Sequence, residues 1–183
     1  MFSAFYSDPH FGHKAIIGFC DRPFADLTDM HAQMLARYNA VVGPGDWCLW
    51  LGDCFFRMGE HETRALLGKM NGHKALVVGN HDRSKAWMCR VGFSFAVDGL
   101  QMEIAGRKVI ASHYPYAGSS RRDGKPDTKF EHRRPRRLKG QVLLHGHTHS
   151  RKKRDGAAVH VGVDAWDYAP ASFAAVEALV AEV

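Results

Sequence analysis

The stretch that decides the fold is QVLLHGHTHS, residues 141–150, in which an apolar run ends in three histidines. The run has the composition of a buried strand. His145, His147 and His149 occupy alternate positions, with one small residue between each pair. In an extended segment such side chains project to the same side, about 6–7 Å apart. Clustered imidazoles favour a metal ion, although a polar turn after a strand also accommodates histidine. Other ligands elsewhere in the chain must decide between these two interpretations.

The same pattern, a short apolar run followed by polar residues, occurs at four earlier places in the chain. In open α/β sheets such loops, just beyond the ends of the strands, are where ligand sites are assembled. Five occurrences in order therefore predict one site built from five loops. The four earlier clusters are Asp8 with His10, then Asp53, then Asn80 with His81 and Asp82, and finally Ser112 with His113.

Helical spacing of apolar residues separates these runs, so the chain is predicted to be an α/β domain. Its length and its 45% hydrophobic content fit one domain over residues 1–183. Residues 99–115 are expected to form a hairpin that turns near residues 105–106, and residues 115–139 a long basic loop. The expected helices cover residues 28–40 with Thr28 as the N-cap, residues 60–72 closed by Gly72, residues 84–90, and a terminal stretch introduced by Pro170 and Ser172.

The formal net charge of +6 is unevenly distributed along the chain. Residues 120–155 carry thirteen Lys and Arg against four acidic residues, and the rest of the chain is net negative. Such a basic segment can concentrate polyanions, and a solvated loop is the alternative interpretation. The first residues lack the features of a secretory signal, and no run approaches the roughly 18 apolar residues of a membrane span. A cytoplasmic protein with no membrane partner and four reduced cysteines is therefore expected.

The polar clusters also carry a resemblance to a known family. In order, the motifs DPH (residues 8–10), GD (52–53), GNHD (79–82), SH (112–113) and GHTH (146–149) resemble the signature of the calcineurin-like metallophosphoesterases, in particular small bacterial or phage members. The resemblance implies a two-sheet β-sandwich flanked by helices, with two divalent metal ions at one edge. It implies seven ligands: Asp8, His10 and His149 for the first ion, Asn80, His113 and His147 for the second, and Asp53 as the bridge. It also implies that His81 stands beside the substrate phosphate and that Asp82 orients it.

This ligand set has a chemistry of its own. Carboxylates, imidazoles and an amide oxygen suit Mn²⁺, Fe, Zn²⁺ or Ni²⁺ and suit Ca²⁺ poorly; Mn²⁺ is the ion we expect. Two such ions lower the pKa of bound water toward about 7, so a metal-bound hydroxide is expected to attack phosphorus. His81 would then assist the departing oxygen as a general acid.

Three functions are compatible with these residues. The first is a phosphodiesterase or phosphatase that acts on a nucleotide or a nucleic-acid end, which the basic loop favours. The second is an enzyme of the same fold that acts on a phosphoprotein, a dinucleoside polyphosphate or another small phosphate. The third is a metal-binding scaffold without catalysis. The native metal, the preference for diesters or monoesters, and the oligomeric state stay open.

The remaining residues of interest are assigned from their positions. His145 precedes the GHTH motif and is expected to pack in the strand near the site. Five other histidines are expected to be surface or satisfied structural residues: His31, His61, His73, His132 and His160. The candidate substrate contacts are His13, Arg121, Arg122, Arg133 and Arg134.

Overall fold

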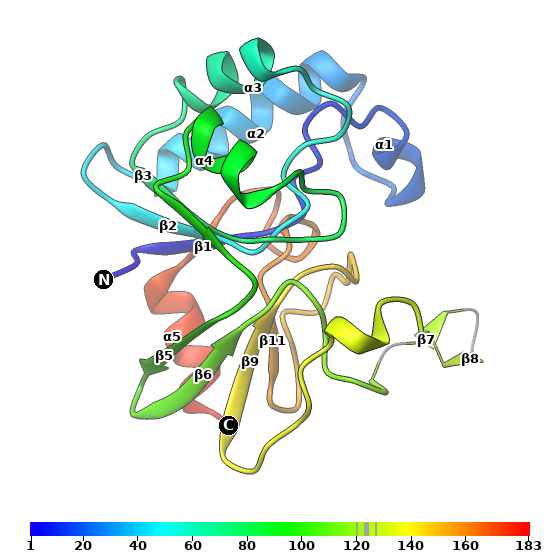
Figure 1. The fold of residues 1–183 in the computed structure, drawn as a ribbon, viewed down its shortest axis with the longest axis vertical. Helices are drawn as coiled ribbons and strands as arrows, with labels where there is room; N and C mark the ends of the chain where they lie inside the picture. Colours follow the sequence, from blue (N-terminus) through cyan, green and yellow to red (C-terminus); the bar gives the residue numbers. More distant parts are fainter. Residues whose placement is uncertain (120, 123–124, 127) are drawn as a thin grey trace.

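The structure is a computed structural model that describes residues 1–119, 121–122, 125–126 and 128–183. Within these residues the main strands form two mixed five-stranded sheets, flanked by helices (Figure 1). The first sheet has the order β12-β1-β2-β3-β4 and the second the order β10-β11-β9-β6-β5. The fold is therefore mixed α/β, as the sequence predicts.

The first sheet is parallel from β1 to β4, and β12 joins it antiparallel to β1. Helices α2, α3 and α4 cover one of its faces (Figure 1). In chain order the elements of this half are β1 (Ala4–Tyr6), α1 (Ile16–Phe19), α2 (Leu27–Val41), β2 (Trp47–Trp50), α3 (Glu60–Leu67), β3 (His73–Val77), α4 (Lys85–Val91), β4 (Phe95–Val97) and β12 (Ala171–Ser172).

In the second sheet β6, β9 and β11 are parallel, whereas β5 and β10 run antiparallel at its two edges. A small pair, β7 with β8, and two 3-10 helices stand outside the two large sheets. The elements of this half are β5 (Leu100–Ile104), β6 (Arg107–Ala111), β7 (Arg121–Arg122), β8 (Lys125–Pro126), η1 (Glu131–Arg133), β9 (Gln141–His145), β10 (Arg154–Asp155), β11 (Ala158–His160), η2 (Val163–Ala165) and α5 (Phe173–Ala181).

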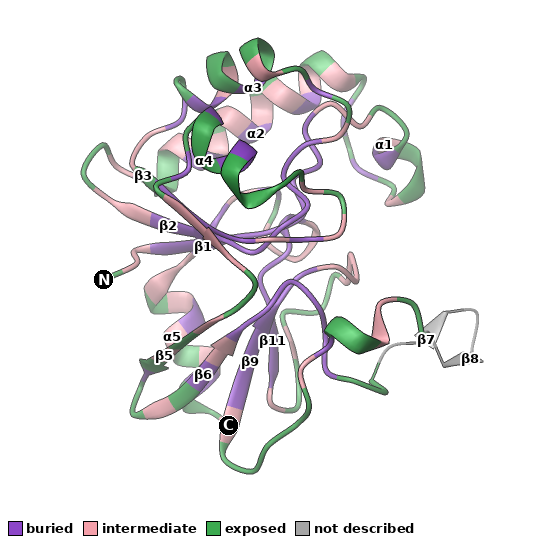
Figure 2. Ribbon diagram, in the orientation of Figure 1, coloured by how far each residue is buried: buried purple, intermediate pink, exposed green. Residues whose placement is uncertain are grey.

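The alternation of side chains along the strands joins these layers. Ala4 and Tyr6 of β1 face the helices, whereas Phe5 between them faces the second sheet. The core between the sheets also receives Val176 and Val180 from α5. Figure 2 shows the central strands β1, β2, β3, β9 and β11 largely buried and the helices exposed on their outer faces. None of the described helices is long and apolar enough to cross a membrane.

Several predicted elements agree with the structure. The hairpin of β5 and β6 pairs Ile104 with Arg107, so its turn lies at residues 105–106 as expected. Both turn residues have positive φ, which is the conformation that two-residue hairpin turns favour. Ser84 caps α4, and Ser172 caps α5, each by accepting a backbone hydrogen bond. The four cysteines are free; Cys48 and Cys54 are buried, Cys20 is partly buried and Cys89 is exposed.

Other boundaries were predicted wrongly. The N-cap of α2 is Asp26, whose carboxylate accepts from the backbone N–H of Asp29, and not Thr28. Helix α3 ends at Leu67, well before Gly72. Gly72 instead turns the chain into β3 at φ 71°, where a Cβ atom would lie 2.6 Å from the carbonyl oxygen of Asp46. The described part of the 115–139 loop contains β7, β8 and η1 rather than irregular backbone alone, and strand β4 was not predicted.

Candidate functional site

The carboxyl ends of β1, β2 and β3 meet those of β6 and β9 at one edge of the two sheets. Direct hydrogen bonds join the loops of one sheet to those of the other. The backbone N–H of His147 donates to both carboxylate oxygens of Asp8, at 3.0 and 2.9 Å. The ring Nδ1 of His113 lies 2.7 Å from the carbonyl oxygen of Leu51 and donates to it. Residues that are up to 139 positions apart in the chain are therefore held together.

Six of the seven predicted ligands fall into two groups at this edge. Asp8, His10 and His149 form one group, in which one ligand atom from each lies within 4.8 Å of the others. Asp53, His113 and His147 form a second group by the same measure. Each group offers imidazole nitrogens and a carboxylate oxygen, which is a suitable donor set for a transition-metal ion.

Asp53 stands between the two groups. Its Oδ2 lies 3.6 Å from Nε2 of His10 in the first group and 3.5 Å from Nε2 of His113 in the second. The seventh predicted ligand, Asn80, belongs with the second group, because its Oδ1 lies 3.2 Å from Nε2 of His113. Nδ1 of His147 is also 3.2 Å from that nitrogen. The structure thus brings all seven residues together, with Asp53 in a position to bridge.

The backbone of the site is unusual. Five of the seven residues have φ between 50° and 69°, a region that few residues other than glycine adopt: Asp8, His10, Asp53, His147 and His149. Such conformations cost free energy and cluster at functional sites. The motif glycine Gly146 has its own steric reason, because a Cβ atom there would overlap the side chains of Ser7 and Asp8. The unusual backbone of these loops is therefore tied to where the side chains of the seven residues lie.

Charge is distributed unequally over the second group. Burial raises the pKa of the Asp53 carboxyl, but the neighbouring His113 imidazole outweighs it and holds that pKa well below its usual range. Burial lowers the pKa of His113, but Asp53 outweighs it and raises the value to about 9. Burial and the nearby His113 lower the pKa of His147 to about 3. Without a metal, His113 therefore holds a proton that a cation between these residues would replace.

His81 is the exposed member of the site. Its side chain is 42% exposed and its Nε2 lies 4.0 Å from Oδ2 of Asp53. Its backbone N–H donates to the other carboxylate oxygen of Asp53 at 2.9 Å. Its ring lies outside both ligand groups but next to His10, with the ring centroids 5.5 Å apart. His81 is thus free to contact a molecule that approaches the site from solvent.

Asp82 does not act as the resemblance implies. Its carboxylate accepts from the backbone N–H groups of Asp53, Cys54 and Gly79, at 2.8 to 3.0 Å. Among the described residues no hydrogen bond joins it to the His81 imidazole. Three backbone amides satisfy this carboxylate, and they tie the loop after β3 to the loop after β2. Asp82 therefore positions the segment that carries His81 instead of orienting the ring.

Two charged residues behind the site, Arg22 and Asp164, could not be predicted from the sequence. Asp164 accepts from Nδ1–H of His149 at 2.8 Å, and from Nε and Nη2 of Arg22 at 3.0 and 3.1 Å. Arg22 also donates to the backbone carbonyls of Asp8 and Pro9. The hydrogen bond to Asp164 fixes the tautomer and the orientation of His149, as the outer partners of metal-binding histidines do. Nothing in the local sequence marks Arg22, because its partner is 142 residues away.

The predicted substrate contacts lie at different places. His13 packs on Phe56, with ring centroids 4.1 Å apart, and its ring is 5.5 Å from that of His10, so it borders the site. Arg133 is exposed and donates to the Tyr114 hydroxyl at 2.9 Å. Arg134 has a fully buried side chain that donates to the carbonyl of Lys129, and its charge contributes to the lowered pKa of His147. The side chains of Arg121 and Arg122 lie outside the described residues.

Two further histidines pack behind the site. His145 is buried in β9 as expected, and its Nδ1–H donates to the carbonyl of Gly146 at 2.8 Å. His160, expected to be a surface or satisfied residue, is only 2% exposed, and neither ring nitrogen has a hydrogen-bond partner among the described residues. Its ring packs against that of His145, with centroids 5.2 Å apart. The sequence of β11, Ala-Val-His, gave no indication of this burial.

Comparisons with known proteins identify relatives of the whole chain. It is 32% identical to the Gene 66 protein of Mycobacterium phage D29 over 88% of this chain and 87% of the relative. It is 30% identical to the Gene 66 protein of Mycobacterium phage L5, over 88% and 86% of the two chains. The uncharacterized protein MJ1445 of Methanocaldococcus jannaschii is 27% identical over 91% and 84%.

A solved structure has the same fold. The crystal structure of the protein of unknown function AQ665 from Aquifex aeolicus matches with a TM-score of 0.73 at 24% identity, over 96% of this chain and 97% of that one. At this identity the likeness concerns the fold alone. No family model matches the chain.

Proposed function

The chain belongs to the family of the mycobacteriophage Gene 66 proteins, and from the site that it carries we propose that it is a binuclear-metal-dependent phosphoesterase. We further propose that its two sheets are those of the calcineurin-like metallophosphoesterase fold. The observation that carries this proposal is the position of Asp53, whose Oδ2 lies within 3.6 Å of imidazole nitrogens from both ligand groups. A carboxylate shared between two mixed N/O groups suits a pair of divalent ions.

The residues themselves fit metal ions. His10 is 2% exposed, and neither of its ring nitrogens has a hydrogen-bond partner among the described residues. A buried imidazole without a partner is costly unless another ligand satisfies it. Asp8, His10 and His149 would hold one ion, Asn80, His113 and His147 the other, and Asp53 both. When bound, the ions would supply Lewis acidity that offsets the charge of a phosphate and lowers the pKa of water.

The chain's own groups divide the remaining work. His81 is the exposed imidazole beside Asp53, so it is placed to donate a proton to the oxygen that leaves phosphorus. Asp82 fixes the loop that carries His81 through its three backbone contacts. Asp164 accepts from Nδ1–H of His149, which leaves Nε2 of that ring available to a metal ion.

For the substrate, we propose a phosphate ester of a nucleotide or of a nucleic-acid end. The support is the basic segment of residues 120–155. It begins shortly after His113 and ends just before β11, so both of its ends are joined to parts of the chain around the site. A phosphatase of the same fold that acts on a phosphoprotein, a dinucleoside polyphosphate or another small phosphate is the alternative. A scaffold without catalysis would need no exposed imidazole at residue 81, and that imidazole favours the enzyme.

The test is hydrolysis by the Mn²⁺-loaded protein of bis-p-nitrophenyl phosphate and of p-nitrophenyl phosphate. We expect turnover that chelation abolishes and that Asp53→Asn removes. Asp167→Asn is the matched control, because the carboxylate of Asp167 is 88% exposed and lies outside both ligand groups. Full hydrolysis by a chelated, metal-free sample would overturn the proposal, as would the absence of turnover with each of Mn²⁺, Fe²⁺, Zn²⁺ and Ni²⁺.

A further inference from the structure

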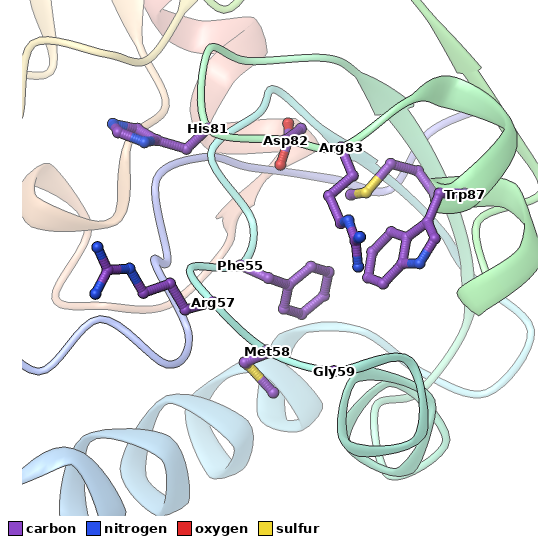
Figure 3. Close-up of a pocket in the computed structure, with 9 residues that line it drawn as sticks. Phe55, Arg57, Met58, Gly59, His81, Asp82, Arg83 and Trp87 are labelled. Carbon is purple, nitrogen blue, oxygen red and sulfur yellow. The ribbon is translucent and has the colours of Figure 1, made fainter.

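A cavity of about 380 Å³ opens directly beside His81. Its walls are the loop after β2 and the loop after β3 with the start of α4, which also supply Asp53 and Asn80 to the site. Phe55, Met58 and Trp87 form buried apolar lining, and His81, Arg57 and Arg83 are exposed. Figure 3 shows the side chains of His81 and Arg57 extending to the same side, whereas Arg83 extends between Phe55 and Trp87. We call this cavity the Arg57–Arg83 pocket.

The two arginines of the pocket are held by aromatic rings instead of carboxylates. The guanidinium of Arg83 lies 4.6 Å from the centroid of the Trp87 ring, and that of Arg57 lies 5.2 Å from the Phe56 ring. Within the described part of the chain neither forms an ion pair with an acidic residue. The one carboxylate in the lining, Asp82, is already satisfied by three backbone amides. Stacking orients a guanidinium but leaves its N–H groups available for an anion.

The position of His81 relates this pocket to the reaction. The imidazole lies between Asp53, at 4.0 Å from its Oδ2, and the pocket that it lines. If His81 protonates the leaving oxygen, the leaving group extends from that oxygen toward the pocket. Guanidinium groups bind phosphate oxygens through paired N–H donors. A cavity of this volume is large enough for part of a small-molecule ligand.

We propose that the Arg57–Arg83 pocket binds a second phosphate, carried by the leaving group of the substrate. This inference rests on the proposed function and deepens it. The preferred substrate is then a nucleotide ester whose leaving nucleoside bears a further phosphate, as in an oligonucleotide. A substrate with an uncharged leaving group reacts at the same site without this contact.

The kinetic test compares dithymidine monophosphate with the same dinucleotide carrying a terminal phosphate at its 3′ or its 5′ end. We expect kcat/KM to be about tenfold or more higher for the form whose leaving nucleoside carries the extra phosphate, the usual scale for a charged hydrogen bond. Arg83→Gln removes most of that preference, which is measured as the ratio of the two kcat/KM values within each variant so that a general change in activity cancels. Lys108→Gln is the control, since it removes one exposed positive charge near the start of β6, whereas His113 follows the other end of that strand.

A wild type without the preference, or an Arg83→Gln variant that keeps it, overturns the pocket while hydrolysis of the aryl diester still supports the proposed function. If no substrate is hydrolysed, the proposed function fails, and a binding measurement then tests whether the pocket holds a phosphate. For this purpose thymidine 3′,5′-bisphosphate is titrated into the chelated protein and the arginine side-chain N–H signals are followed by NMR. Shifts at Arg57 and Arg83 that Arg83→Gln weakens support the pocket, and their absence overturns it.

Discussion

The substitution Asp164→Asn tests how the buried charges behind the site are coupled. Asp164 and Arg22 have side chains that are only 2% and 0% exposed, and two hydrogen bonds of 3.0 and 3.1 Å join them. Asparagine keeps the shape of the side chain but removes its charge. It also replaces one carboxylate oxygen by an NH₂ group, which donates and cannot accept, so at least one N–H of Arg22 or His149 that now donates to Asp164 loses its acceptor. The guanidinium of Arg22 is then left buried without its counter-charge.

Removing one partner of a buried pair costs about 3–5 kcal/mol of unfolding free energy, because the other charge stays buried. The control Asp167→Asn makes the same chemical change three residues away. Asp167 pairs with Arg37 at 3.2 Å, but its side chain is 88% exposed, so we expect a loss of less than about 1 kcal/mol. The two variants therefore differ chiefly in the burial of the ion pair that is broken.

Urea unfolding of the chelated proteins measures both free energies directly. Titration of Mn²⁺ into the same samples gives a second result, because the charged acceptor of the His149 Nδ1–H is replaced by a neutral amide. We expect the affinity of the first metal position to fall about 10–100-fold for Asp164→Asn and to stay unchanged for Asp167→Asn. If Asp164→Asn costs no more stability than its control, the coupling described here is wrong, whatever the metal affinity.

Three further predictions concern other residues. His81→Ala should keep its bound metal and lose about 10²–10⁴-fold in turnover of substrates with poor leaving groups, and less with p-nitrophenolate; loss of metal instead would show that His81 is a ligand. Burial, with a smaller contribution from His145, lowers the pKa of His160 from 6.5 to about 3. Below about pH 6.5 this histidine is therefore protonated in the unfolded chain but stays neutral in the folded one, so the free energy of unfolding falls as the pH drops. Between pH 8 and 5.5 the wild type should lose about 1.4 kcal/mol more than His160→Gln in urea unfolding, and parallel curves would contradict this. Joint replacement by Gln of Arg133 and Arg136, two arginines of the basic segment, should raise KM for an oligonucleotide. The slope of log binding constant against log salt concentration should shrink by up to about one unit per lost phosphate contact. An equal loss of activity on a small aryl diester would instead indicate structural damage.

The spatial proximity of the seven predicted ligands could be predicted because it depends on local features. Asp8, Asp53 and Asn80 each follow a short apolar run, and parallel strands place their carboxyl ends at one edge of a sheet. The α/β class follows from the same alternation of runs and helical patterns. The hairpin at residues 105–106 was predictable for a similar reason, since its partners are adjacent in the chain.

The features that were missed depend on contacts between distant parts of the chain. The pairing of Arg22 with Asp164 spans 142 residues, and no local pattern distinguishes it from two surface charges. The contacts of Asp82 are with backbone amides, which every residue has, so the motif could not show that it ties two loops together. The end of helix α3 is a different case, because its C-cap is Gly68, a local stop signal, and Gly72 only turns the chain into β3.

The most direct test of the binuclear site is the number and coupling of the Mn²⁺ ions that the protein binds. Metal analysis after dialysis, with electron paramagnetic resonance on the same samples, counts the ions and detects whether they share a ligand. We predict two ions per chain with a spin-coupled spectrum in the wild type, and loss of that coupling in Asp53→Asn, because Asp53 faces both ligand groups. A wild type that binds no Mn²⁺, or that binds isolated ions unaffected by Asp53→Asn, would contradict the binuclear site.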